Sequence, residues 1–193
     1  MELKGSETEK NLLKSFAGES QARMRYNYFA SAAKKEGFEQ ISGIFSETAD
    51  NEKEHAKIFF KHLKESNGEP TEITASYPAG EIGTTEENLL AAANGEKEEW
   101  RELYPEFEKI AREESFDEIA ISFHEIAEVE EQHEKRFRKL LENIEKERVF
   151  EKENIVKWKC RNCGYVHEEK SAPEICPACK HPQSYYEILC ENY

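Results

Sequence analysis

Residues 38–60 read "FEQISGIFSETADNEKEHAKIFF", and this stretch decides the fold. Its core-type side chains recur every three or four residues, as on the buried face of an α-helix that includes Phe38, Ile41, Phe45, Thr48, Phe59 and Leu63. The same spacing places Glu52 and His55 on that face. Two simple explanations remain open for a single helix. Either the register shifts and both side chains are in solvent, or the histidine is buried, hydrogen-bonded and inert.

A second stretch, residues 116–140, repeats the pattern as "FDEIAISFHEIAEVEEQHEKRFRKL". Its apolar residues fall in the same register as those of the first stretch, and so do its polar exceptions. The matched pairs are Glu52 with Glu130, His55 with His133 and, earlier in each half, Tyr26 with Tyr104. An internal repeat that keeps an unusual polar pair in register indicates a shared role for that pair.

The composition favours a soluble helical protein. Hydrophobic residues make up 37% and charged residues 35% of the 193-residue chain, which suits helices with one buried and one charged face. The formal net charge of −14 argues against direct binding to nucleic acids or anionic membranes. The N-terminal residues form no apolar signal segment, and no apolar run is long enough to cross a membrane. We therefore expect a cytoplasmic protein that binds neither nucleic acid nor membrane.

The periodicity predicts four long helices, at about residues 7–36, 38–66, 85–113 and 116–146. Ser6 or Thr8 is suited to cap the first helix, and Gly37 is suited to end it. Very short connections join the first helix to the second and the third to the fourth. Each of these pairs is therefore expected to form an antiparallel hairpin.

The connection between the second and third helices, residues 67–85, reads "NGEPTEITASYPAGEIGTT". A tight hairpin needs far fewer residues, whereas a connection of this length can run back along a helix of about 45 Å. We therefore expect a mainly α-helical fold, a ferritin-like four-helix bundle with one long crossover connection. A surface loop without such a course is the alternative.

The sequence pattern changes after Lys146. A charged linker follows, and then short strand-like runs, aromatic residues, prolines and paired cysteines. About forty residues cannot bury a sufficient core, so this small β-rich module is expected to need a metal to fold. The predicted organisation is a helical domain at residues 1–146, a linker at 147–155 and the small module at 156–193.

The other two helices also carry acids on their predicted core faces, Glu19 in the first and both Glu96 and Glu99 in the third. Carboxylates buried together are costly or take up protons, and divalent cations remove that cost. One Glu from each of two helices, with Glu-x-x-His from each of the others, is the pattern of di-iron and di-manganese proteins. The candidate metal-ligating and catalytic residues are Glu19, Glu52, His55, Glu96, Glu99, Glu130 and His133.

One glutamate exceeds the usual six ligands, so Glu96 or Glu99 is a solvated neighbour or a ligand used in one oxidation state. The spacing from Glu96 to Tyr104 is one residue longer than the matching spacing in the first helix. A π-bulge in the third helix would restore the match. Tyr26 and Tyr104, also candidate site residues, are expected to hydrogen-bond the ligand carboxylates, with a redox role as the lesser alternative.

Two Cys-x-x-Cys pairs, "CRNC" and "CPAC", form the second candidate metal site. Four thiolates in this spacing fit tetrahedral zinc or iron, and a reducing compartment favours metal ligation over disulfides. The proposed ligands are Cys160, Cys163, Cys176 and Cys179. A structural zinc ribbon is the alternative for this module. The fifth cysteine, Cys190, is expected to be a buried apolar filler.

Several stretches together resemble the rubrerythrin family over essentially the whole chain. In the helical part these are "FAGESQARMRYNYF", "ETADNEKEHAK", "PAGEIG", "REESFDEIA" and "EEQHEKRF". The stretch "CRNCGYVHE" and the later "CPACKHP" resemble its C-terminal rubredoxin-like module. One departure is Lys180, which follows the final cysteine of the set where rubredoxins often have glycine.

The resemblance implies a non-heme diiron peroxidase that reduces hydrogen peroxide to water and protects against oxidative stress. It implies two irons in the bundle and one iron held by the four cysteines. The cysteine-bound iron would relay electrons from a rubredoxin or an NADH-dependent reductase. For the individual ligands, it implies that Glu52 and Glu130 bridge, Glu19 serves one iron, Glu96 and His133 serve the other, and Glu99 exchanges with His55.

The resemblance also implies a head-to-tail homodimer, in which electrons cross between subunits. The charged linker 147–155 contains no Gly or Pro to reverse the chain sharply, although its length permits a return to its own bundle. Two alternative functions remain. One is a ferroxidase or iron-storage protein, which leaves the four cysteines unexplained. The other is a structural interaction protein with a zinc ribbon, which leaves the buried acids unexplained.

Overall fold

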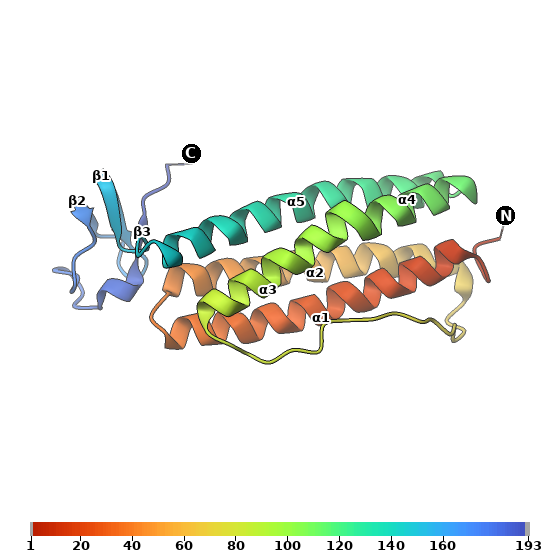
Figure 1. Cartoon of the computed structure of the whole chain (residues 1–193), viewed down its shortest axis with the longest axis horizontal. Helices are drawn as coiled ribbons and strands as arrows, with labels where there is room; N and C mark the ends of the chain where they lie inside the picture. Colours follow the sequence, from red (N-terminus) through yellow and green to blue (C-terminus); the bar gives the residue numbers. More distant parts are fainter. Residues whose placement is uncertain (1, 192–193) are drawn as a thin grey trace.

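The computed structural model of the chain describes residues 2–191. A bundle of long helices forms most of the molecule, and a small module with three strands lies at one end of it (Figure 1). The N-terminus lies near the opposite end of the bundle (Figure 1). This is the predicted ferritin-like four-helix bundle with a small rubredoxin-like module. None of the helices in the described part of the chain is long and apolar enough to cross a membrane.

The first hairpin consists of α1 (Glu7–Lys35) and α2 (Glu39–His62), followed by a 3₁₀ turn at Leu63–Ser66. Ser6 caps α1, because its hydroxyl accepts a hydrogen bond from the backbone N–H of Glu9 at 3.0 Å. Gly37 ends the helix with φ of 86°, a left-handed conformation that favours glycine. The first hairpin therefore has the predicted boundaries to within a few residues.

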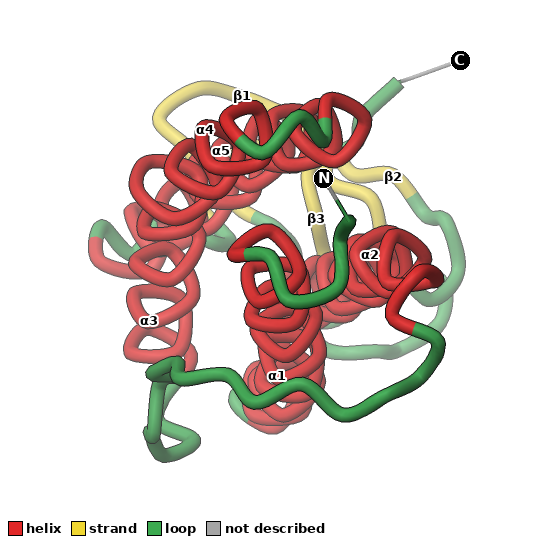
Figure 2. The backbone as a smooth tube through the Cα atoms, turned by 90° about the vertical axis from the view of Figure 1, so that its right-hand side faces the viewer, coloured by secondary structure: helices red, strands yellow, loops and turns green. Residues whose placement is uncertain are grey.

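The crossover from residue 67 to residue 84 runs back along the bundle beside α1, as Figures 1 and 2 show. It delivers the chain to α3 (Thr85–Glu98), which begins with a capping box formed by Thr84 and Glu87. The connection therefore takes the predicted long course and does not form a tight hairpin.

The third predicted helix is continuous but changes its winding in the middle. A π-helix, η2 (Glu99–Leu103), separates α3 from α4 (Tyr104–Glu113). A π-helix inserts one residue relative to regular α-helical phase, so the predicted π-bulge is confirmed. The last helix, α5 (Asp117–Glu145), packs antiparallel to this broken helix and completes the bundle.

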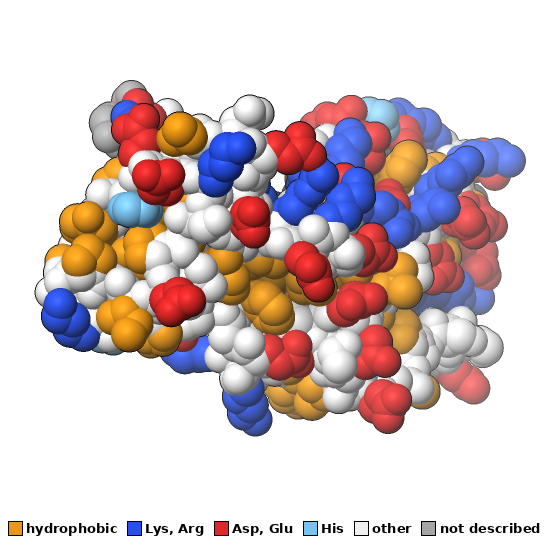
Figure 3. All heavy atoms as spheres, turned by 60° about the vertical axis from the view of Figure 1, so that its left-hand side comes forward, with side chains coloured by type: hydrophobic (Ala, Val, Ile, Leu, Met, Phe, Trp, Pro, Cys, Tyr) orange, Lys and Arg blue, Asp and Glu red, His pale blue; other side chains and the backbone are white. Residues whose placement is uncertain are grey.

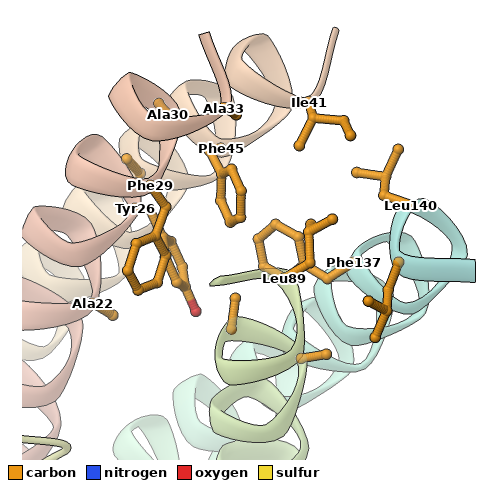
Figure 4. Packing of buried hydrophobic residues seen from close by; sticks show 14 residues of the cluster. Ala22, Tyr26, Phe29, Ala30, Ala33, Ile41, Phe45, Leu89, Phe137 and Leu140 are labelled. Carbon is orange, nitrogen blue, oxygen red and sulfur yellow. The ribbon is translucent and has the colours of Figure 1, made fainter. Parts of the chain in front are cut away.

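Aromatic side chains fill the bundle on both sides of a polar middle. Tyr26, Phe45 and Phe137 come from three helices and pack with ring centroids 5.1 to 6.1 Å apart (Figure 4). A second aromatic cluster toward the other end contains Phe59, Tyr104, Phe107 and Phe123. The repeat therefore places one aromatic group above and one below the polar residues between them.

The C-terminal module is an antiparallel sheet with strand order β2-β1-β3. Its strands are β1 (Glu151–Cys160), β2 (Val166–Ser171) and β3 (Tyr186–Ile188). Trp158 is fully buried at its centre. Because β1 begins at Glu151, the later part of the segment expected to be a linker is already strand. The last two residues of the predicted module lie outside the described residues.

The module packs on the end of its own bundle. Phe150 stacks on Phe38 at the start of α2, with ring centroids 6.2 Å apart and planes inclined by 9°. Arg161 lies over Gly43 so closely that a Cβ on Gly43 would stand 2.6 Å from the Arg161 Nη2 atom. Arg161 is also ion-paired to Glu187. The absence of a side chain at Gly43 therefore permits this contact between module and bundle.

We predict that Gly43→Leu loosens the module without weakening α2. Leucine would displace Arg161, whereas it raises helix propensity over glycine by about 1 kcal/mol. Amide hydrogen exchange should become faster in β1 and in the segment that precedes it, while α2 stays protected. Gly80→Leu is the control, because a Cβ there meets nothing within 4 Å. Unchanged exchange in β1 would show that the Arg161 contact does not hold the module.

Candidate metal centres

The polar residues predicted on the core faces meet in the middle of the bundle. Glu19 comes from α1, Glu52 and His55 from α2, Glu96 from α3, and Glu130 and His133 from α5. All six are buried, and none has a relative exposure above the 7% of His55. A shift of helical register into solvent is therefore ruled out for these six residues.

The two histidines lie against the same two carboxylates. The His55 Nδ1 atom is 2.9 Å from Glu52 Oε2 and 2.8 Å from Glu130 Oε1. The His133 Nδ1 atom is 3.2 Å from Glu52 Oε1 and 2.7 Å from Glu130 Oε2. Each of the two glutamates therefore faces one histidine with one oxygen and the other histidine with its second oxygen.

These side chains form two groups whose ligand atoms lie within 4.8 Å of one another. One group contains Glu19, Glu52, His55 and Glu130, and the other contains Glu52, Glu96, Glu130 and His133. Glu52 and Glu130 belong to both groups. Two adjacent metal positions that share two carboxylates account for this arrangement, which is the pattern of di-iron carboxylate bundles.

Many polar atoms at the centre have no hydrogen-bond partner of good geometry. They are Glu19 Oε2, both oxygens of Glu52 and of Glu130, Glu96 Oε2, and Nδ1 of His55 and of His133. Buried polar atoms are normally satisfied, and each orphan costs about 1–3 kcal/mol. These unsatisfied atoms belong to the residues of the two ligand groups. The residues therefore fit a pair of divalent cations, one in each group.

Two tyrosines hold the outer carboxylates from across the bundle. The Tyr26 hydroxyl of α1 donates to Glu96 Oε1 of α3 at 2.5 Å, and the Tyr104 hydroxyl of α4 donates to Glu19 Oε1 of α1. Each repeat half thus orients the outer glutamate of the other half. The π-helix between Glu96 and Tyr104 allows both residues to reach the centre despite their longer spacing.

Glu99 differs from the other six residues, because it belongs to neither group. It starts the π-helix and lines a groove between α1 and the third helix. The sequence predicted Glu99 as one of seven candidate ligands, with Glu96 or Glu99 in excess of six. In the structure Glu99 is the one of the seven that lies outside the two groups, and its role as a ligand stays a prediction. Gly18 and Tyr77 also line this groove, and the sequence reasoning did not single them out. The one available signal was a glycine inside an otherwise regular helix.

The charges at the centre balance poorly without cations. Burial, and then the neighbouring carboxylates, raise the pKa of Glu19, Glu96 and Glu99 well above the usual value. Burial alone would lower the pKa of His55, but the Glu130 and Glu52 carboxylates raise it to about 10. In the absence of metal the cluster therefore takes up protons, and bound cations would release them.

The four predicted cysteines meet in the small module. The Sγ atoms of Cys160 and Cys179 are 3.7 Å apart, as are those of Cys163 and Cys176. A tetrahedral site with metal–sulfur distances of about 2.3 Å has sulfur–sulfur edges of about 3.8 Å. The backbone N–H of His181 is the main cause that lowers the pKa of Cys179 to about 6. The geometry therefore fits one tetrahedral metal ion.

Both cysteine turns have a residue with positive φ after the second cysteine. Gly164 has φ of 80°, and Lys180 has φ of 63° at the equivalent place. The N–H of Gly164 bonds the Cys160 carbonyl at 2.8 Å, and that of Lys180 bonds the Cys176 carbonyl at 2.9 Å. A lysine in the left-handed region costs about 1–2 kcal/mol. Lys180 therefore forms the same turn as Gly164, but with a strained backbone.

Cys190 is exposed, so the prediction that it is a buried filler was wrong. The N–H of Leu189 makes the final backbone bond to β1, at 2.8 Å from the Lys157 carbonyl, and Cys190 follows this bond. The chain is already leaving the sheet at this point. An apolar residue type near the end of a strand does not indicate on which side of the sheet the chain departs.

Family models match both parts of the chain. The model described as Rubrerythrin matches residues 10–141, and the rubredoxin-like domain of rubrerythrin matches residues 158–187. The first match contains every candidate ligand of the bundle. The second contains the four clustered cysteines.

Curated relatives match over nearly the full length. Rubrerythrin of Porphyromonas gingivalis is 59% identical, and the match covers 99% of this chain and 94% of the relative. Rubrerythrin of Nitratidesulfovibrio vulgaris is 58% identical, with 99% and 98% covered. Rubrerythrin-1 of Clostridium acetobutylicum is 57% identical, again with 99% and 98% covered.

Solved structures agree with the fold. Partially reduced nigerythrin superposes with a TM-score of 0.65 at 28% identity, covering 96% of this chain and 87% of that one. A bacterioferritin from Desulfovibrio desulfuricans superposes with a TM-score of 0.64 at 23% identity, covering 74% and 82%, and shows the shared fold alone. The geometry and these matches give the chain a diiron carboxylate–histidine site and a four-cysteine rubredoxin-like iron site.

We predict that removing the iron destabilises the bundle, and more so at high pH. The raised pKa values of the buried acids and of His55 stabilise the metal-free fold at low pH, and this contribution is lost as the pH rises. Thermal unfolding of loaded and chelator-treated protein at pH 5.5 and pH 8.5 measures the effect. The difference in Tm should be larger at pH 8.5, where a loss of about 3 kcal/mol corresponds to about 10 °C. An equal difference at both pH values would contradict the protonation argument.

We predict that Lys180→Gly stabilises the module relative to Lys180→Ala. Both variants lose the hydrogen bond from Lys180 Nζ to the Pro177 carbonyl at 2.9 Å, so their difference isolates the backbone conformation. Glycine should be more stable by about 1 kcal/mol, because only glycine accepts positive φ without strain. Release of the cysteine-bound iron in denaturant, followed by its visible absorption, gives the two midpoints. Equal midpoints would show that the turn is not strained.

Proposed function

Because the chain belongs to the rubrerythrin family, we propose that it is a diiron peroxidase that reduces hydrogen peroxide to water and protects against oxidative stress. Each turnover consumes one peroxide, two electrons and two protons and yields two water molecules. The observation that carries the proposal is the pair of adjacent ligand groups that share Glu52 and Glu130. Two ferrous ions held by these groups would together supply the two electrons that cleavage of an O–O bond requires.

We assign the ligands by position. Glu52 and Glu130 would hold both irons, because each of them belongs to both groups. Glu19 and His55 would serve one iron, and Glu96 and His133 would serve the other. For Glu99, just outside the groups, we propose a role as a ligand that would exchange with His55 when the oxidation state changes. Its position on the π-helix supports this role, because such irregular turns are common at functional sites.

The chain's other residues hold this arrangement in place. The hydroxyls of Tyr26 and Tyr104 fix the direction of the outer carboxylates by donating to one oxygen of each. The other oxygen then remains directed toward the centre. The aromatic clusters above and below the ligands exclude bulk water along the bundle axis. A low-dielectric surrounding strengthens the ligand charges and limits side reactions.

We further propose that the four-cysteine iron relays electrons to the diiron centre from a rubredoxin or an NADH-dependent reductase. Hydrophobic side chains gather on the module, whereas charged side chains dominate the helices behind it (Figure 3). The exposed apolar residues of the module are Ile155, Val166, Ile175 and Ile188. A small apolar surface near the metal suits the short-lived contacts of electron-transfer partners.

We also propose that the protein works in the cytoplasm. None of the five cysteines, which all lie within the described residues, forms a disulfide, which is consistent with a reducing compartment.

The position of the module supports a relay between subunits. Arg161, next to the first ligand cysteine, lies over Gly43. From Gly43 to His55 along α2 is about 18 Å at 1.5 Å per residue. Electron transfer falls steeply with distance, so a closer centre in a second copy is favoured. We propose a head-to-tail homodimer in which the module of one subunit lies against the bundle of its partner.

We predict that Glu52→Ala and Cys160→Ala abolish turnover at different steps. Chemically reduced Glu52→Ala should react with peroxide at least about 100-fold more slowly, because it loses a shared ligand. Cys160→Ala should still consume one equivalent of peroxide when chemically reduced, but should fail with a reductase and NADH. Stopped-flow absorbance separates the two reactions. Fast peroxide reaction in Glu52→Ala would overturn the proposed peroxidase centre.

Matched controls are available for both variants. Glu54→Ala changes an exposed glutamate on the same helix, and Cys190→Ala changes an exposed cysteine outside the cluster, so both should retain turnover.

Mixing the Glu52→Ala and Cys160→Ala variants tests the subunit arrangement. Activity should return in heterodimers confirmed by mass spectrometry, because each contains one intact pair of centres. Heterodimers without activity would place the relay within one chain.

A further inference from the structure

A groove with a volume of about 370 Å³ leads from the surface to Glu99. Its walls are α1 on one side and the third helix on the other, from Gly95 through the π-helix to Ile110. Residues 75–78 of the crossover lie across it. Glu99 is a charged neighbour of Glu19 and Glu96, and Tyr104, which donates to Glu19, also lines the groove. The groove therefore leads from solvent toward one side of the clustered ligands.

Tyr77 and Gly18 define the narrow part of the groove. A Cβ on Gly18 would lie 3.7 Å from Tyr77 Cε1 and 4.0 Å from Glu99 Oε1. The empty position at Gly18 therefore lies between the tyrosine ring and the carboxylate. Glycine inside a helix costs about 1 kcal/mol relative to alanine. A Cβ at these distances would make only ordinary contacts, so neither the backbone of α1 nor the packing requires glycine here. What the missing side chain does is to leave the gap between Tyr77 and Glu99 open.

The segment that carries Tyr77 is attached weakly. In the described structure, one hydrogen bond joins residues 70–82 of the crossover to the bundle. The Tyr77 hydroxyl donates it to the Lys14 carbonyl at 2.8 Å. Almost all side chains of this segment are exposed. Local opening costs little where few contacts and bonds are broken. Tyr77 can therefore leave the groove without disturbing the helices.

A second hollow, on the α2–α5 face, reaches His133 but is a poorer route. Arg136 lines it and bonds Glu47 at 2.7 Å and Thr48 at 2.9 Å, which links α5 to α2 across the gap. The His133 ring itself closes the bottom and is only 4% exposed. At this face an arginine held by two bonds and a ligand side chain stand in the way. At the other face the obstacle is one loosely held tyrosine.

We propose that the groove beside Glu99 is the path by which small peroxides reach the diiron centre, with Tyr77 as its removable cover and Gly18 as the residue that sets its width. This inference rests on the proposed peroxidase function for the identity of its substrate. The narrow part of the groove should admit hydrogen peroxide more easily than bulky alkyl hydroperoxides. The ligand residues themselves do not set this preference.

Azide binding tests the path without relying on turnover. Azide is a small anion whose association with the oxidised diiron centre is followed by its visible absorption in a stopped-flow instrument. Tyr77→Ala should raise the association rate about tenfold, and Tyr77→Phe, which loses only the bond to the Lys14 carbonyl, should raise it less. Gly18→Leu should lower the rate at least tenfold. Tyr28→Ala is the control, since Tyr28 is an exposed tyrosine of α1 outside the groove.

Gly18→Ala keeps the test valid if leucine disturbs the bundle. Its Cβ meets only ordinary contacts, so it should raise the Tm of the protein while it slows azide association. Tyr77→Ala should also raise the rate with tert-butyl hydroperoxide relative to that with hydrogen peroxide. Equal azide rates in all groove variants would overturn the path, as would faster azide association in Arg136→Ala alone. If the azide rates respond as expected but the protein does not reduce peroxide, the access path is supported and the proposed peroxidase function is overturned.

Discussion

Mutual repulsion among buried carboxylates is the constraint on which the rest of this structure depends. Glu19, Glu52, Glu96 and Glu130 lie at the centre of the bundle, with oxygens directed at one another and at two histidines. No hydrophobic gain from the surrounding side chains offsets such a cluster if it stays charged and unpartnered. Cations bound by the two ligand groups would convert the least favourable part of the core into a cross-link between four helices.

Several features of the helices position the residues of this centre. The tyrosines that orient the outer glutamates come from opposite hairpins, so the two halves cannot separate without breaking both hydrogen bonds. The π-helix at Glu99–Leu103 interrupts regular winding where α-helical phase would turn Tyr104 away. The aromatic residues then fill the space on each side of the polar layer. The third helix therefore departs from regular α-helical winding beside the ligands.

Much of this arrangement was predictable because it is periodic. The repeated Glu-x-x-His positions fixed the faces of α2 and α5, and the mismatch in spacing before Tyr104 located the π-helix. The cysteine spacing predicted a four-sulfur site, which the 3.7 Å sulfur contacts confirm. The metal ligation by individual residues stays a prediction, since geometry shows proximity and not bonding.

The features that escaped prediction have no period. The course of the crossover places Tyr77 over α1, but nothing in the alternation of its residues indicates that contact. The docking of the module brings Arg161 against Gly43 and Phe150 against Phe38, and the partners in each pair are far apart in sequence. Cys190 leaves the sheet because β3 ends before it. Each of these features depends on tertiary contacts or on the direction of the chain, which the local sequence pattern does not encode.

The internal repeat has a consequence for the origin of the centre. Two copies of one hairpin, related by a twofold axis, would each bring a tyrosine, an outer glutamate and a Glu-x-x-His pair to a common middle. Each tyrosine would then hold the glutamate of the other copy, as Tyr26 and Tyr104 do in the joined chain. A symmetric ancestor of this kind could hold two identical metal ions. The inserted residue of the π-helix breaks this symmetry, because α1, the matching helix of the first half, is regular throughout.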